Sequence, residues 1–315
     1  MDALTALLSE RDWILADGAT GTALTFALPD PRQPVELLNL TAPDVVAANH
    51  EAATLAGADL ILTNSFGANL SRLRLAGADA QLAEINRAAA RIAREAADRA
   101  GRRVVVAGSI GPSGEIMAPM GALSHADAVA MFHEQALALQ EGGVDMLWFE
   151  TLSAAEELRA AAEAALLTGL PWAVTMSFEM AGRTMMGVTP ARLAALVEQV
   201  QHKPIAFGAN CGLGAADNLR AIAGFAASGS ERPLIAKGNA GIAHHHHGRL
   251  EYDGTPALMG DYAALARDLG CRIIGGCCGT TPAHLAEMRA ALTTRPRGPR
   301  PSLEQITEAV GSFTG

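Results

Sequence analysis

The stretch RIIGGCCGTTP, residues 272–282, contains the unit from which most of the chain is built. A short apolar run ends in glycines, a few polar or reactive residues follow, and "TPAH" at 281–284 opens a helix-like segment with capping chemistry. Near-continuous apolar strands that alternate with helices are typical of a parallel sheet covered by helices on both faces. The same unit recurs along the chain.

Eight such units can be counted from the N-terminus to the stretch quoted above. The expected strands are 13–16, 58–64, 103–110, 144–150, 171–178, 204–210, 233–239 and 271–276. The expected helices lie near 43–56, 80–100, 124–141, 153–168, 190–202, 214–228, 259–269 and 281–293. This pattern predicts an α/β protein with a single (β/α)8 TIM barrel over residues 1–293, with a doubly wound open sheet as the alternative. The Pro/Arg-rich tail, 294–315, is expected to pack outside the barrel or to mediate contacts.

Composition narrows the class of protein further. The chain has 315 residues, of which 50% are hydrophobic, so a large core is available. Its net charge of −9 and pI near 5.5 argue against nucleic acids and anionic membranes as partners. No apolar stretch approaches the roughly 20 residues of a membrane span, and the N-terminal sequence lacks a signal-peptide core. Four cysteines do not make a disulfide framework, so a cytoplasmic protein is expected.

A barrel places its chemistry at the C-terminal ends of its strands. The residues at the predicted ends are Asp17-Gly18, Asn64, Gly111-Pro112, Glu150, Asn210-Cys211, Asn239 and Cys277-Cys278. Glu150 is the hardest to explain structurally, because a carboxylate that finishes an apolar strand is costly unless it is used. Asp17 has a simpler structural explanation, because it could cap a loop. The predicted site therefore lies at this end of the barrel.

Three of the four cysteines, Cys211, Cys277 and Cys278, fall at strand C-termini, whereas Cys271 opens the last strand and is expected to be a small core residue. Three thiolates suit a tetrahedral Zn²⁺ with one open position, which is the arrangement of a catalytic zinc site. Such an ion would deprotonate an incoming thiol and so generate a nucleophile. A redox pair of cysteines and inert buried thiols remain alternatives on these residues alone.

Eight motifs add a resemblance to a known family. In chain order they are DGATGTAL (17–24), ADLILTNSFGAN (58–69), GSIGPSGE (108–115), WFET (148–151), GANCGLG (208–214), KGNAGI (237–242), YDGTP (252–256) and GGCCGTTP (275–282). Together they resemble the homocysteine S-methyltransferase family, over essentially residues 11–293. The resemblance implies a (β/α)8 barrel whose zinc is held by three cysteines, which match Cys211, Cys277 and Cys278.

The resemblance also implies roles for other strand ends. Asp17 and Gly18 match the element that contacts the amino-acid end of homocysteine, and Glu150 matches the residue that binds the substrate ammonium. Asn239 matches an asparagine that can occupy the open zinc position until the substrate thiol displaces it. The implied reaction is attack of a zinc-bound homocysteine thiolate on an activated methyl group, which forms methionine.

Three further features of the sequence each have two possible interpretations. Asn64 and Asn210 are candidates for substrate binding, although they could instead orient loops at the rim. The run His244–His247 could bind a metal, but a solvated loop is the simpler expectation. Met117 and Met120 either flank the substrate or only pack.

The methyl donor is less well defined than the thiol acceptor. A quaternary ammonium such as glycine betaine is normally held by aromatic faces. The family's betaine users carry aromatic residues where this chain has Gly67 and Thr151, and the chain has only two tyrosines, Tyr252 and Tyr262. A methyl-corrinoid would need no such cage, and because no DxHxxG element occurs here it would be presented by a separate partner protein. We therefore rank the corrinoid first, betaine second, and S-methylmethionine or S-adenosylmethionine third.

Two other classes of function compete with a methyltransferase. A thiol redox or zinc-handling protein would use Cys277 and Cys278 and would not need Glu150. A barrel enzyme of phosphate chemistry would use the glycine-rich segments after the last two strands as a phosphate loop. Cys211 discriminates among these, because neither alternative requires a third cysteine.

Overall fold

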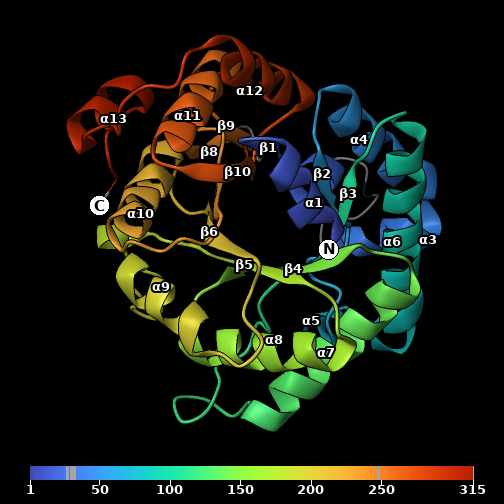
Figure 1. Ribbon diagram of the computed structural model, residues 1–315. Coiled ribbons are helices and arrows are strands. Elements are labelled where there is room, and N and C mark those ends of the chain that lie inside the picture. Colours follow the sequence, from blue (N-terminus) through green and yellow to red (C-terminus); the bar gives the residue numbers. More distant parts are fainter. Residues whose placement is uncertain (26–27, 29–32, 247–248, 315) are drawn as a thin grey trace.

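The computed structural model describes residues 1–25, 28, 33–246 and 249–314. These residues form a (β/α)8 barrel, which confirms the predicted fold (Figure 1). The barrel strands are β1 (Ile14–Leu15), β2 (Leu60–Leu62), β3 (Val105–Ile110), β4 (Met146–Leu152), β5 (Trp172–Met176), β6 (Ala206–Cys211), β7 (Leu234–Gly238) and β10 (Cys271–Gly276). All paired neighbours are parallel, in the order β1-β10-β7-β6-β5-β4-β3-β2.

Helices surround the strands (Figure 1). They are α1 (Ala3–Glu10), α2 (Gly21–Thr25), α3 (Leu38–Thr41), α4 (Pro43–Leu55), α5 (Leu70–Leu75), α6 (Leu82–Arg99), α7 (His125–Glu141), α8 (Ala155–Thr168), α9 (Pro190–Gln199), α10 (Ala215–Ala227), α11 (Pro256–Asp268), α12 (Pro282–Thr294) and α13 (Leu303–Val310), with 3₁₀ turns η1 (Val35–Leu37), η2 (Asp79–Gln81) and η3 (Met180–Gly182). The predicted helix at 259–269 begins earlier, at Pro256, because the Thr255 side chain caps it by accepting from the backbone N–H of Leu258. None of the helices in the described ranges combines the length and apolar character needed to cross a membrane.

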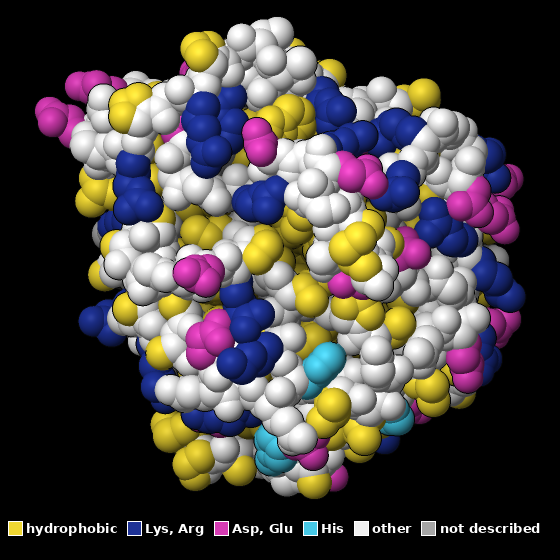
Figure 2. Space-filling model, in the orientation of Figure 1, with side chains coloured by type: hydrophobic (Ala, Val, Ile, Leu, Met, Phe, Trp, Pro, Cys, Tyr) yellow, Lys and Arg dark blue, Asp and Glu magenta, His cyan; other side chains and the backbone are white. Residues whose placement is uncertain are grey.

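Helix α1 covers the N-terminal end of the barrel. Its buried leucines, Leu4, Leu7 and Leu8, join a cluster with side chains from the strands, including Ile14 and Leu60. Figure 2 views the molecule in the same orientation as Figure 1 and shows many Lys and Arg side chains on this face, several beside Asp or Glu. The opposite end of the strands is left for the site.

The barrel closes at a seam between β1 and β2, where only one isolated bridge, Ala16 to Leu60, continues the ladder. Two aspartate side chains complete the seam by accepting hydrogen bonds from backbone N–H groups. Asp59 accepts from Leu15 at 3.1 Å, and Asp17 accepts from Leu62 at 2.7 Å. This closure excludes the open doubly wound sheet.

Asp59 is fully buried and lies at the N-terminal end of the seam. Three arginines, Arg11, Arg102 and Arg289, form ion pairs with it at 2.7 to 3.2 Å. Asp17 lies at the C-terminal end, next to the candidate site. The two ends of one seam are therefore held by two carboxylates with different cationic partners.

An antiparallel hairpin, β8 (Ala243–His246) and β9 (Arg249–Tyr252), lies between β7 and α11. The sequence predicts a solvated loop around His244–His247; the structure instead pairs the backbone of His244–His246 as a strand, although the His244 side chain is exposed as expected. The exposed His244 side chain lies 3.0 Å from the Asp253 carboxylate, and His247 is outside the described residues.

The C-terminal tail lies against α10 and α11 (Figure 1). Helix α13 contacts both of these helices, and the Phe313 ring lies 4.9 Å from the Arg220 guanidinium. The backbone N–H of Thr314 donates to the Asp217 carboxylate at 3.1 Å.

Candidate metal and substrate site

Three cysteine side chains meet at the C-terminal end of the barrel. Cys211 ends β6, and Cys277 and Cys278 follow β10 directly. Their sulfur atoms lie within 4.8 Å of one another, and the Cys211 and Cys278 sulfurs are 3.9 Å apart. Within the described part of the chain, this is the one group of His, Cys, Asp or Glu side chains with the spacing to hold a metal ion. Cys271, at the start of β10, is buried and does not belong to it.

The backbone at both cysteine segments is unusual. Cys211 has a φ of 59°, a left-handed conformation that is uncommon for a residue with a side chain. Gly279 has a φ of 77°, and a Cβ there would meet the Tyr252 ring at 2.3 Å. These two features turn the segments from β6 and β10 toward one another, so that adjacent cysteines reach a common point.

Two asparagine side chains form hydrogen bonds with the cysteine segments. Asn210 accepts from the Thr151 N–H at 2.8 Å and donates to the Cys277 sulfur at 3.8 Å. Asn239 accepts from the Cys278 N–H at 3.1 Å and donates to the Gly212 carbonyl at 2.8 Å, so it joins the two cysteine segments. Both amides are thus engaged, and a ligand role for Asn239 stays a prediction.

Each of the three thiols affects the pKa of the others. Hydrogen bonding with Cys277 and Cys278 raises the pKa of Cys211, and hydrogen bonds from Cys211 and Cys277 lower the pKa of Cys278. Because metal binding releases thiol protons, a cation at this point would displace protons from the trio.

A buried ion pair lies beneath the cysteines. The Lys237 ammonium, from β7, lies 2.5 Å from Asp17 Oδ1 and 3.1 Å from the Asp17 carbonyl oxygen. Burial is the largest single influence on the pKa of Lys237 and lowers it, but the charge of Asp17, the charge of Glu150 and the hydrogen bond to Asp17 together outweigh it, so the net shift is upward. Lys237 was missed in the sequence, although a lysine inside the apolar run PLIAKGN is as costly to bury as Glu150 and was a comparable signal.

Glu150 lies in β4 with its side chain buried. It accepts from the Ser109 hydroxyl at 2.5 Å. Burial, followed by the negative charge of Cys277, raises the pKa of Glu150 to about 7. A carboxyl group in this environment gains most from a cationic partner.

These side chains share one cavity of about 410 Å³, which we call the cysteine pocket. It is lined by the three cysteines and by Asp17, Gly18, Asn64, Glu150, Lys237 and Glu36, among others. Asn64 reaches it, but its amide N–H groups bind the Val35 carbonyl and the Asn39 side chain, which matches the loop-orienting alternative. Glu36 had no signal in the sequence, because its position on a short 3₁₀ turn has no periodic pattern.

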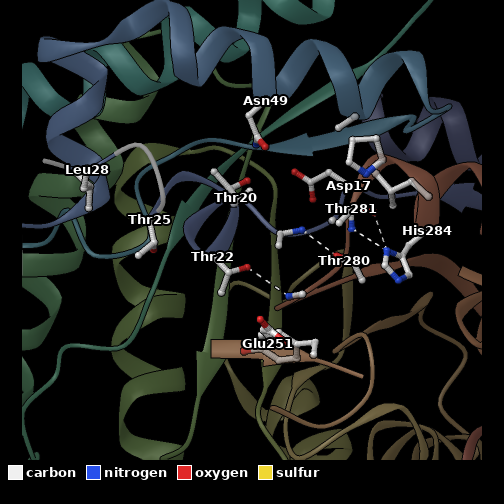
Figure 3. Close-up of a pocket in the computed structure, with 18 residues that line it drawn as sticks. Asp17, Thr20, Thr22, Thr25, Leu28, Asn49, Glu251, Thr280, Thr281 and His284 are labelled. Carbon is white, nitrogen blue, oxygen red and sulfur yellow. Dashed lines mark hydrogen bonds between the residues drawn. The ribbon is translucent and has the colours of Figure 1, made fainter. Parts of the chain in front are cut away.

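Figure 3 shows a second cavity, of about 800 Å³. The two share residues of the 17–25 segment, which is a wall common to both. In Figure 3, threonines of this segment lie on one side of Asp17, with Thr280, Thr281 and His284 on the other. The His284 ring accepts a hydrogen bond from the Thr281 N–H, and its other nitrogen lies 2.8 Å from the Gly254 carbonyl oxygen. Met117 and Met120 line neither cavity.

Fold and site together define a (β/α)8 barrel enzyme with a thiol-lined candidate metal centre at the C-terminal ends of its strands. The family model for homocysteine S-methyltransferase matches residues 14–292. The chain belongs to the homocysteine S-methyltransferase family.

Proteins similar to this chain include a methionine synthase, matched in sequence, and a homocysteine methyltransferase, matched in structure. The chain is 31% identical over 331 residues to a methionine synthase of Mycobacterium tuberculosis, covering 98% of this chain but only 27% of that protein. It also resembles the homocysteine methyltransferase MmuM of Escherichia coli, in an oxidized form (TM-score 0.78) and a metallated form (TM-score 0.77), each 25% identical over 92% of this chain and 99% of the other.

Proposed function

We propose that this protein is a zinc-dependent homocysteine S-methyltransferase that forms methionine. The observation that carries the proposal is the trio of cysteine sulfurs within 4.8 Å of one another, in a pocket that also contains a buried carboxyl group. A redox or zinc-handling protein would need the vicinal cysteines but not Glu150 or the family's other elements.

The residues fit a zinc ion. Cys211, Cys277 and Cys278 would hold it, because thiolates are zinc's preferred soft ligands and three of them leave one position open. When bound, zinc would deprotonate the homocysteine thiol and present it as a nucleophile. The metallated structure of MmuM supports a metal in a protein of similar fold.

The rest of the pocket would orient the substrate. Glu150 would accept the homocysteine ammonium, because the one described cation whose charge acts on its buried carboxyl group, Lys237, is already paired with Asp17. Asp17 is bound to Lys237, so we assign it and Gly18 to shaping the wall against which the amino-acid end lies. Asn210 would hold Cys277 in place, and Asn64 would hold the neighbouring loop.

The methyl donor would be a methyl-corrinoid on a partner protein, or glycine betaine or another onium compound. Phe66 is the one phenylalanine, tyrosine or tryptophan among the described pocket-lining residues, and its ring already has the Arg72 guanidinium 5.4 Å from its centre. The described residues that line the cysteine pocket therefore form no cage of aromatic faces. We retain a cytoplasmic location in the proposal, since the cysteine trio must stay reduced to bind zinc.

The direct test is methionine formation by zinc-loaded protein with homocysteine and one donor at a time. The donors are methylcobalamin, glycine betaine, S-methylmethionine and S-adenosylmethionine, with Cys211→Ala as the inactive control. Methionine from any donor, lost in the control, supports the proposal. Zinc-loaded protein that binds no homocysteine would contradict it, and a reducible Cys277–Cys278 disulfide in such protein would favour the redox alternative.

A further inference from the structure

Glu36 is a second buried carboxyl group in the cysteine pocket. It lies on η1, is 5% exposed, and lines the pocket together with Glu150 and the cysteines. Its Oε1 accepts from the Gly67 N–H at 2.6 Å. A side chain at position 67 would disturb that contact, since a Cβ at Gly67 would come within 2.8 Å of the same oxygen.

Unlike Asp17, Glu36 forms no ion pair with any residue in the described ranges. The cation that acts on it is Arg72, but the Arg72 Nε donates to the Pro112 carbonyl at 3.0 Å and its guanidinium lies over Phe66. Burial raises the pKa of Glu36. A buried carboxylate without a close cation is costly, which makes Glu36 a site for a cation that arrives from outside.

Other buried carboxyl groups show what a purely structural role looks like. Glu157 is equally buried, but its Oε1 accepts both the N–H and the hydroxyl of Ser113, and it does not line the pocket. Asp17 has Lys237. In the proposed function Glu150 takes the homocysteine ammonium, so Glu36 is the remaining acidic group of the pocket without a cation.

We propose that Glu36 binds the positive charge of a cationic methyl donor, a sulfonium or quaternary ammonium compound, in place of an aromatic cage. This inference rests on the proposed function. It makes Glu36 a determinant of donor specificity and favours an onium compound over a protein-bound corrinoid.

The charge change of the reaction fits this role. The homocysteine sulfur forms a bond to the methyl carbon while the donor's C–S or C–N bond breaks. The bonding electron pair stays on the donor heteroatom, which becomes neutral, and methionine is a neutral thioether. For a sulfonium donor the demethylated product is a neutral thioether, so Glu36 loses its cationic partner and holds the donor more tightly than the product; the amine left by a quaternary ammonium donor is neutral only until it takes up a proton.

The test compares equilibrium binding of matched ligands by calorimetry. Glycine betaine and 3,3-dimethylbutyrate have the same shape, but only the first has a cationic head, and S-methylmethionine provides a sulfonium. We expect wild-type protein to bind the cations in preference to dimethylbutyrate. Glu36→Gln should weaken cation binding by about tenfold or more and lose the preference. Glu36→Asp should keep the preference, and Glu157→Gln, the matched control, should behave as wild type.

Two further measurements separate this inference from the proposed function. Zinc content and homocysteine affinity should be unchanged in Glu36→Gln, which also shows that the variant is folded. Wild-type protein that binds no cation, or Glu36→Gln that prefers cations as wild type does, would overturn the role of Glu36. Turnover with methylcobalamin alone would also overturn it while leaving the methyltransferase function intact, whereas failure to bind homocysteine would contradict the function itself.

Discussion

The Lys237 ammonium lies 2.5 Å from the Asp17 carboxylate, and this ion pair joins β7 to β1 across the intervening strand β10. Both side chains are almost completely buried. The pair thus neutralises two charges in the wall of the pocket and holds the β1 end of the barrel seam. Its loss would affect the stability of the fold and the shape of the site together.

Lys237→Met should lower the free energy of unfolding by about 3–5 kcal/mol, because it leaves the Asp17 carboxylate buried without its cation. Adding Asp17→Asn to the same chain should recover part of that loss, since the remaining amide is neutral. Urea denaturation of both variants and of wild type measures the effect. Equal stabilities of the single variant and wild type would show that the pair contributes little.

Cys211→Ala should abolish stoichiometric zinc binding, because two adjacent thiolates without a third ligand from β6 do not complete the site. Cys271→Ala is the matched control, since Cys271 is buried away from the trio. Zinc per chain after dialysis against a weak chelator is the measurement. Retention of zinc by Cys211→Ala would exclude the three-thiolate arrangement.

Glu150→Gln should weaken homocysteine binding by about tenfold or more while zinc content stays at the wild-type level, because the amide cannot pair with the substrate ammonium. Titration calorimetry with homocysteine, together with a zinc assay, separates the two effects. A variant that instead loses its zinc would move Glu150 from substrate binding to support of the metal site.

His50 predicts an acid-dependent loss of stability. It is buried in α4, and neither ring nitrogen has a hydrogen-bond partner in the described structure. Burial, opposed in part by the charge of Asp17, lowers its pKa from 6.5 to about 4. Below pH 6.5 the unfolded chain binds a proton that the folded protein does not, so the free energy of unfolding falls as the pH drops toward 4.

His50→Leu should remove this dependence. We expect wild type to lose about 2 kcal/mol more than the variant between pH 7 and pH 5. Chemical denaturation at both values measures the difference, and the comparison cancels the contribution of other acidic groups. Parallel losses in the two proteins would mean that His50 is protonated, or reached by water, in the folded state.

The strands could be predicted from the sequence because each is an apolar run of strand length followed by glycine or polar residues. The apolar pattern also located the main helices. Helix α1 and the β8–β9 hairpin were not predicted. The helical character of Ala3–Glu10 depends on the open end of the barrel that its leucines cover, and the hairpin depends on pairing between segments with little apolar periodicity.

The cysteines could be placed at one end of the barrel because each follows a recognisable strand. The residues that pair with the charged side chains of the site could not be predicted in the same way. Lys237 is distant from Asp17 in the chain, and Glu36 becomes buried only when η1 folds back against Gly67. Burial and pairing of single charges depend on tertiary contacts, which leave no spacing pattern in the sequence.

The seam between β1 and β2 has one more consequence. Because the Leu62 N–H donates to the Asp17 side chain, the hydrogen-exchange rate of this amide depends on a carboxylate in the wall of the pocket. The Leu15 N–H at the other end of the seam donates to Asp59, which is surrounded by arginines far from the pocket. Exchange at Leu62, compared with exchange at Leu15, would thus report filling of the pocket as a local change in barrel closure, without any label on the substrate.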